Sequence, residues 1–119
     1  MLEGTGNEDG LFESLCGIEY YNNQILVTDK NKVHFFTPDG EYLKSWDFEN
    51  TPRYISVNED ELYISCESFI QKMDLSGKIL AKIGLGVLER AYGIGFDAQG
   101  RVFVVDASLN NIKVFTIVE

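Results

Sequence analysis

This chain of 119 residues contains few of the residue types that build disulfide frameworks, metal centres or catalytic triads. It has two cysteines, Cys16 and Cys66, one histidine and two prolines. Because the cysteines are far apart and only one histidine accompanies them, neither a disulfide scaffold nor a tetrahedral zinc site is expected. We predict two free, mostly buried thiols in a reducing, cytoplasmic compartment. We also predict no bound metal and no cofactor.

Basic charge and long apolar runs are scarce as well. The chain has 10 Lys and Arg against 19 Asp and Glu, a net charge of −9, and its lysines are scattered singly. Nucleic-acid binding requires a basic surface that displaces counterions from phosphates, so it is not expected here. The longest apolar runs, such as Val102–Val105, have the length of a strand and not of a membrane span. The first fifteen residues are acidic and glycine-rich, unlike a secretory signal. We therefore expect a soluble protein without membrane contact.

The chain does contain a threefold internal repeat. Residues 15–46 align without a gap on residues 52–83, so that Ile18 falls on Ile55, and residues 91–119 form a third copy in which Ile94 takes the same place. In the first copy we expect strands at Gly17–Tyr21, Gln24–Asp29, Lys32–Thr37 and Glu41–Phe48. Asn, Asp and Gly between these segments favour tight hairpin turns. The second strand of each copy is apolar on both faces, which indicates a strand covered on both sides.

Four antiparallel strands in each repeat of about 40 residues are typical of β-propeller blades. The sequence therefore predicts an all-β fold, a partial or open propeller that forms one domain over residues 1–119. Blade 1 covers about 15–48, blade 2 about 52–84 and blade 3 about 91–119, and the outer strand of blade 3 is missing. A meander sandwich is the structural alternative, but it does not explain the repeated register.

The third copy resembles a repeat of the NHL family. The resemblance rests on Gly93-Ile94, Gly100, Val104-Val105-Asp106, Asn110, Ile112 and Phe115, and the first copy matches less fully. It implies an NHL-type propeller, commonly a ring of six blades, of which this chain would be half. The ring would be completed by further blades of a parent chain or by a second copy in a homodimer.

The sequence offers little that could carry out catalysis. Asp29 and Asp106 follow the second strands, where a carboxylate accepts hydrogen bonds from the backbone of the next turn. We expect this structural role for both, and we expect His34 to be a partly exposed strand residue. Without a second histidine and a nearby nucleophile no triad can form, so the chain is not expected to be an enzyme.

A binding surface is the functional hypothesis that remains. Its candidate residues lie in the turns and at the starts of the first strands: Lys30, Asn31, Lys32, Arg53, Tyr54, Tyr92, Asn110 and Asn111. Tyrosine and arginine anchor protein interfaces well because they bury area and form hydrogen bonds together. We predict a non-catalytic module that binds a protein or peptide partner within a larger regulatory or scaffold protein. The alternatives are a segment of a metal-dependent propeller enzyme, lactonase-like or lyase-like, with catalytic residues in other blades, and RNA binding.

Overall fold

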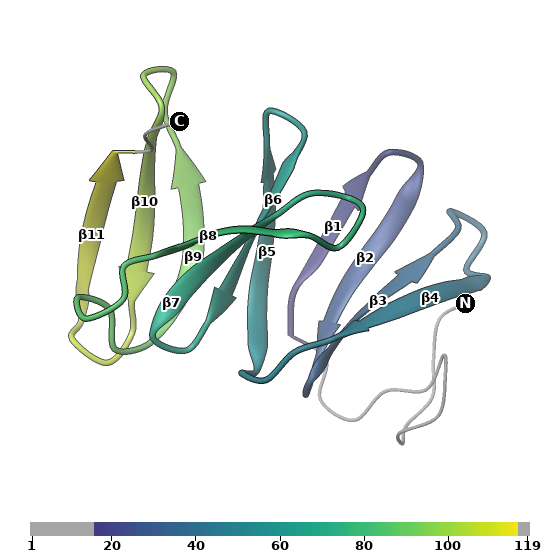
Figure 1. The fold of residues 1–119 in the computed structure, drawn as a ribbon, viewed down its shortest axis with the longest axis horizontal. Helices are drawn as coiled ribbons and strands as arrows, with labels where there is room; N and C mark the ends of the chain where they lie inside the picture. The colour runs from purple at the N-terminus through teal and green to yellow at the C-terminus, as the bar shows by residue number, and fades with distance from the viewer. Residues whose placement is uncertain (1–15, 117–119) are drawn as a thin grey trace.

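The computed structural model describes residues 16–116, which form three antiparallel sheets and confirm the predicted all-β fold (Figure 1). The first sheet contains β1 (Ile18–Tyr21), β2 (Gln24–Asp29), β3 (Lys32–Phe36) and β4 (Tyr42–Asp47). The second contains β5 (Pro52–Asn58), β6 (Glu61–Cys66), β7 (Phe69–Met73) and β8 (Ile79–Ile83). The third contains β9 (Ala91–Phe96), β10 (Arg101–Asp106) and β11 (Asn111–Thr116). We refer to the three sheets as blades 1, 2 and 3. Within residues 16–116, no helix is long and apolar enough to cross a membrane.

The strand register confirms the repeat found in the sequence. The aligned pairs Ile18 and Val27, Ile55 and Ile64, and Ile94 and Val104 are direct cross-strand partners in blades 1, 2 and 3. A register shift between the third and fourth strands also recurs, at Phe35/Phe36 in blade 1 and at Lys72/Met73 in blade 2. The three sheets are therefore copies of one structural unit.

The turns explain why each unit folds back on itself so tightly. Asn22 and Asn23 between β1 and β2 have φ values of 55° and 59°, and Glu59 and Asp60 between β5 and β6 have values of 50° and 63°. Two successive residues with positive φ define the turn that matches the twist of a two-residue hairpin. Asparagine tolerates this conformation well, as the sequence indicated for the first turn.

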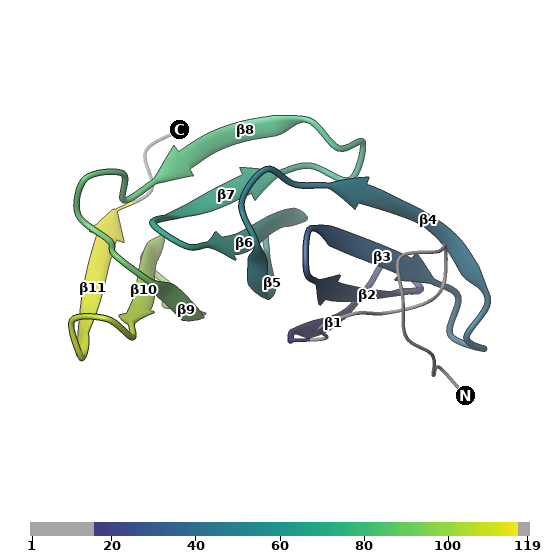
Figure 2. The same ribbon diagram turned by 90° about the horizontal axis from the view of Figure 1, so that it is seen from below.

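The three blades stand side by side in chain order (Figure 1). Seen from below, the first strands β1, β5 and β9 lie along one edge of the molecule, and β4 and β8 lie along the opposite edge (Figure 2). The first strands of blades 2 and 3 pack on the preceding blade: β5 contacts β1 and β2, and β9 contacts β5 and β6. We call the edge formed by the first strands the inner edge.

Apolar side chains fill both spaces between the blades. Between blades 1 and 2, Leu26, Val33 and Phe35 face Leu62 and Ile64, and all five are fully buried. Between blades 2 and 3 the core includes Tyr63, Ile70, Val102 and Val104. Trp46 packs against the first core with its ring 4.6 Å from that of Phe35. Several aromatic residues thus fill the gaps between blades.

A hydroxyl on the second strand links each of the first two blades to the next. The Thr28 hydroxyl donates a hydrogen bond to the Arg53 carbonyl oxygen at 2.8 Å and accepts one from the Gly17 backbone N–H at 2.6 Å. Ser65, at the same repeat position in blade 2, donates to the Tyr92 carbonyl oxygen. The two acceptors also occupy equivalent positions, so the bond between blades is a repeated feature. Both donor residues are fully buried, and each bond aligns the inner strand of the following blade.

Replacing Thr28 with valine tests this bond, because valine keeps the shape of threonine and removes the hydroxyl. We expect Thr28→Val to lower the free energy of unfolding by about 2 kcal/mol, since the Gly17 N–H and the Arg53 carbonyl lose a buried partner. Thr37→Val is the matched control, because the Thr37 hydroxyl accepts only an exposed turn hydrogen bond from Glu41. Urea denaturation followed by circular dichroism measures both. Equal losses in the two variants would contradict a special role for the bond between blades.

Candidate functional site

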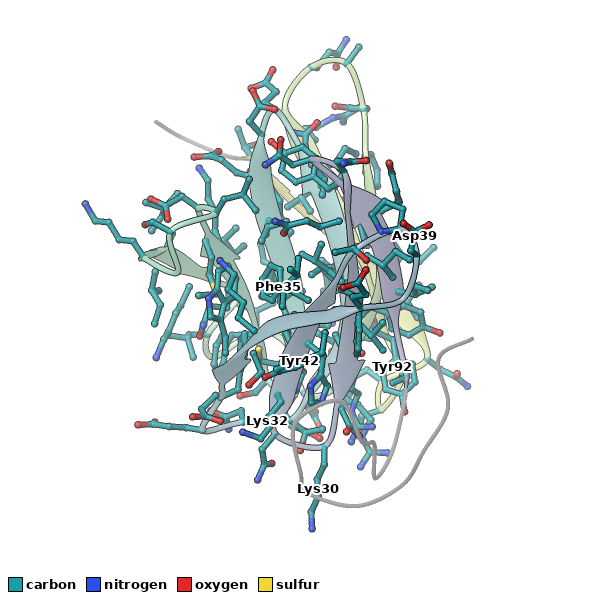
Figure 3. All side chains as sticks on the ribbon, turned by 90° about the vertical axis from the view of Figure 1, so that its right-hand side faces the viewer. Lys30, Lys32, Phe35, Asp39, Tyr42 and Tyr92 are labelled. Carbon is teal, nitrogen blue, oxygen red and sulfur yellow. The ribbon has the colours of Figure 1, made fainter. Side chains whose placement is uncertain are left out.

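The predicted binding residues lie at one end of the blades. The turns between the second and third strands, together with the starts of the first strands, share this end because neighbouring strands are antiparallel. Figure 3 shows Lys30, Lys32 and Tyr92 toward the same lower end of the molecule, with Tyr92 well apart from the two lysines.

Arg53, Tyr54 and Tyr92 come together at the inner edge, and we call them the Arg–Tyr cluster. The Arg53 guanidinium carbon lies 5.4 Å from the centre of the Tyr92 ring, a cation–π distance. The Tyr54 and Tyr92 rings are 5.7 Å apart at an angle of 49°. The cluster joins β5 to β9 and therefore requires blades 2 and 3 to be packed together.

Glu67, in the turn between β6 and β7, fixes the arginine of this cluster. Its Oε1 lies 2.6 Å from Arg53 Nη2, and its Oε2 lies 4.0 Å from Arg90 Nε. The hydrogen bond that Arg53 donates to Glu67 raises the pKa of Arg53 above its ordinary value. The Arg53 Nε is buried and has no hydrogen-bond partner within residues 16–116. A buried donor without a partner carries a desolvation cost that a ligand's acceptor would relieve.

The other five predicted residues lie in blades 1 and 3 and have contacts within their own blades. In blade 1, Lys32 forms an exposed ion pair with Asp47 at 2.6 Å, the Lys30 N–H donates to Asp29, and the Asn31 carbonyl accepts from Phe48. In blade 3, Asn110 has a φ of 58°, which makes it a turn residue, and the Asn111 side chain accepts a hydrogen bond from Lys113. These residues shape the turns of two different blades.

Asp106 performs the structural role expected from the sequence and extends it. Its fully buried carboxylate accepts hydrogen bonds from the backbone N–H groups of Ser108 and Leu109 in its own turn. It also accepts from Glu89 and Arg90, in the segment that crosses from blade 2 to blade 3. Burial alone would raise the pKa of Asp106, but these hydrogen bonds and the Lys113 ammonium hold the pKa below its ordinary value. Asp106 is therefore a brace within the fold.

The expected exposures of the His34 and Cys16 side chains are wrong. His34 is buried, not partly exposed: it lies beside Phe36 and Tyr42, with Nε2 3.3 Å from Asp29 Oδ2. Cys66 is buried as expected, and this burial raises the pKa of its thiol to about 12. Cys16, which precedes β1, is exposed and not buried as expected.

The described residues contain no group of three or more His, Cys, Asp or Glu side chains placed to hold a metal ion. The sequence pointed to Arg53, Tyr54 and Tyr92 but missed Glu67 and Arg90. Glu67 has a φ of 55° in its turn, and nothing in its local sequence distinguishes it from other turn carboxylates. Its role follows from strand pairing, which brings the turn next to the start of β5.

No protein-family model matches this chain, and no curated protein matches it in sequence. Solved structures do match it. Virginiamycin B lyase from Staphylococcus aureus aligns with a TM-score of 0.68 and 14% identity, over 95% of this chain and 43% of the lyase chain. A streptogramin B lyase aligns with a TM-score of 0.63 and 14% identity, over 91% and 42%. A protein of unknown function from Bacteroides thetaiotaomicron aligns with a TM-score of 0.69 and 17% identity, over 96% and 32%.

These similarities show the fold of the chain. The three sheets are blades of a partial β-propeller that is not closed. The chain spans less than half of the length of the lyases that it matches.

Proposed function

We propose that this chain is a non-catalytic propeller segment of the NHL type that binds a protein or peptide partner through the Arg–Tyr cluster. The observation that carries the proposal is the joint presentation of an arginine and two tyrosines at the inner edge, with the guanidinium held by Glu67. Arginine and tyrosine are enriched among residues that dominate binding energy at protein interfaces.

The geometry of the cluster suggests the chemistry of its partner. Tyr54 is 40% exposed and offers an aromatic face, while Arg53 offers a buried Nε that lacks an acceptor. A peptide that places an apolar side chain on Tyr54 and a carbonyl or carboxylate oxygen near Arg53 would use both groups. Glu67 lowers the entropy cost of binding, because it already holds the Arg53 guanidinium in one position before a partner arrives.

Peptides selected from a random phage-displayed library on the wild-type chain provide the probe. We expect Tyr54→Ala and Arg53→Ala each to raise the Kd of selected peptides about tenfold or more, since loss of an interface anchor costs about 2 kcal/mol. Leu80→Ala is the control, because Leu80 is 38% exposed on the outer strand β8 and is remote from the cluster in the sheet order. Fluorescence polarisation measures the affinities. Peptides whose binding survives both cluster substitutions would place the interaction elsewhere.

The alternative, a segment of a propeller enzyme, draws its support from the lyases among the matching structures. A thermal-shift measurement with calcium or zinc separates the two functions. We expect no rise in Tm with either ion if the chain is a binding module. A rise of several degrees would favour the metal-dependent enzyme, because a ligand that binds only the folded state raises its stability.

A further inference from the structure

The face of blade 3 that points away from blade 2 exposes positions that are buried in the other two blades. Ile112 is 66% exposed, whereas its counterparts Val33 and Ile70 are fully buried. Val105 is 44% exposed, whereas its counterparts Thr28 and Ser65 are fully buried in the interfaces to the next blade. We call this surface the third-blade face. Its exposed apolar residues occupy the positions that blades 1 and 2 use to contact the following blade. A further blade could therefore pack on this surface as blade 2 packs on blade 1.

The opposite end of the molecule exposes the complementary surface. Ile18 on β1 is 68% exposed, whereas its counterpart Ile55 in blade 2 is 6% exposed because it packs against blade 1. Tyr20, two residues farther along the same side of β1, is 60% exposed. We call this surface the first-blade face. Farther from the inner edge Val27 and Phe36 are buried, so its exposed part follows β1.

The third-blade face contains a hollow into which large side chains can fit. The hollow has a volume of about 350 Å³ and is lined by residues that include Gly93, Gly95, Phe103, Val105 and Ile112. Its two glycines leave space beside Phe103 and Val105. Across the interface between blades 1 and 2, the equivalent surface of blade 1 receives Ile55, the counterpart of Ile18. The first-blade face therefore offers side chains of the kind that this hollow accepts.

Gly93, which lines this hollow, lacks a side chain at a position where the backbone of a further blade would pass. At the equivalent Gly17 of blade 1, an added Cβ would lie 2.5 Å from the Arg53 carbonyl oxygen, because the inner strand of blade 2 passes directly above it. Blade 2 has Tyr54 at this position, with its ring against Tyr92. Blade 3 has glycine at this position, as blade 1 does. Within the described residues a side chain would fit here, because a Cβ on Gly93 would meet only Val105 Cγ2, at 3.8 Å. A further blade could therefore approach Gly93 as closely as blade 2 approaches Gly17.

We propose that two copies of this chain pair head to tail, with the first-blade face of each copy seated on the third-blade face of the other. Each chain carries the third-blade face at one end and, at the other, the part of the first-blade face that is exposed along β1, so the two contacts of such a pair are identical. Propellers close with roughly four to eight blades, and one, two or three copies supply three, six or nine. Two sets of the three described blades thus supply a number of blades that can close a ring. This inference is independent of the proposed peptide binding at the Arg–Tyr cluster.

Light scattering and sedimentation at micromolar concentration test the pairing in the full chain. We expect twice the mass of one chain, with tighter association as salt is raised, because each copy has a net charge of −9 and salt screens the repulsion. Ile112→Glu and Ile18→Lys should each raise the dimer Kd about 100-fold or more, since each leaves an unpaired charge in an apolar contact. Both positions are exposed in the single chain, so the fold should persist in circular dichroism. Leu80→Glu, on the outer strand β8, should leave the mass unchanged.

Mixing the two variants identifies the orientation. Within the chain, the counterparts of Ile18 and Ile112 lie in the same core at each interface between blades. Ile55 lies with Val33 between blades 1 and 2, and Ile94 with Ile70 between blades 2 and 3. In a head-to-tail pair of Ile18→Lys with Ile112→Glu, one interface joins Lys to Glu and the other is wild type, so an equimolar mixture should regain the dimer mass. A mixture that stays monomeric would overturn the head-to-tail arrangement. A wild-type chain that is monomeric would overturn the pairing itself and point to further blades in a longer polypeptide as the occupant.

Discussion

Asp106→Ala is expected to lower the free energy of unfolding by about 4 kcal/mol, the largest effect of any substitution considered for this chain. The change leaves four backbone N–H groups without their acceptor and removes the negatively charged partner of Lys113, 3.6 Å away. Because two of these groups belong to the crossing segment at Glu89 and Arg90, hydrogen exchange should accelerate there as well as in the turn after β10. Urea denaturation and amide exchange measure the two effects.

Asp97→Ala is the matched control for Asp106. The Asp97 carboxylate also accepts two backbone hydrogen bonds in a turn, from Gln99 and Arg101, but it does so at the surface and within one hairpin. We expect its denaturation midpoint to stay close to that of the wild type. If both aspartates behaved alike, the stabilisation would come from the turn motif and not from the link between blades 2 and 3.

The pH dependence of stability follows from the lowered pKa of Asp106. In the unfolded chain this carboxyl group titrates near its ordinary pKa of about 3.9, and in the folded chain it titrates lower. Its contribution is therefore complete above the unfolded pKa and is lost as the pH falls through the folded pKa. The difference in unfolding free energy between the wild type and Asp106→Asn should be constant near neutral pH and shrink below about pH 4. A difference that grows on acidification would contradict this assignment.

Gly17→Ala is expected to lower the free energy of unfolding by about 3 kcal/mol, because its Cβ would lie 2.5 Å from the Arg53 carbonyl oxygen and 3.1 Å from Tyr54 Cα. Both contacts are with backbone, so relief requires blade 2 to move away from blade 1. Such a movement would also lengthen the hydrogen bond between Thr28 and Arg53. Denaturation followed through the fluorescence of Trp46, which packs in the core between these blades, measures the loss.

Gly95→Ala is the control for Gly17→Ala. A Cβ on Gly95 meets nothing within 4 Å, and the equivalent positions in the other blades hold Glu19 and Ser56. We expect a change within about 0.5 kcal/mol. If Gly17→Ala lowered the free energy of unfolding no more than Gly95→Ala, this would contradict close packing of the inner strands at Gly17.

The sequence predicted most of the fold because the fold is built from short, repeated units. The strands of blade 1 were predicted to within a residue or so, since Asn22-Asn23 and the apolar run Ile25–Val27 determine turn and strand through local conformation. The brace at Asp106 was also partly predictable, because two of its hydrogen bonds lie within three residues. The other two join residues more than a dozen positions away and depend on how the chain crosses between blades.

The candidate site was less predictable from the sequence. Arg53, Tyr54 and Tyr92 were named from their places at the starts of first strands. Lys30 and Asn111 were named with them as turn residues, but Lys30 lies in blade 1, and Asn111 lies on β11, which β10 separates from the strand of Tyr92 in blade 3. Glu67 was missed because its partner lies across a strand pair. The burial of His34 was missed because one of its aromatic neighbours, Tyr42, comes from the next strand, β4.

The sequence by itself determined the repeat, the turns and the all-β class of this protein, since each of these depends on backbone preferences and apolar patterns within a few residues. Only the tertiary structure decided which side chains meet at the inner edge, which carboxylates brace the crossings and which blade faces stay open. Those outcomes depend on packing between blades, where side chains 25 or more residues apart come into contact, as Thr28 does with Arg53. Spacing along one blade carries no information about such contacts.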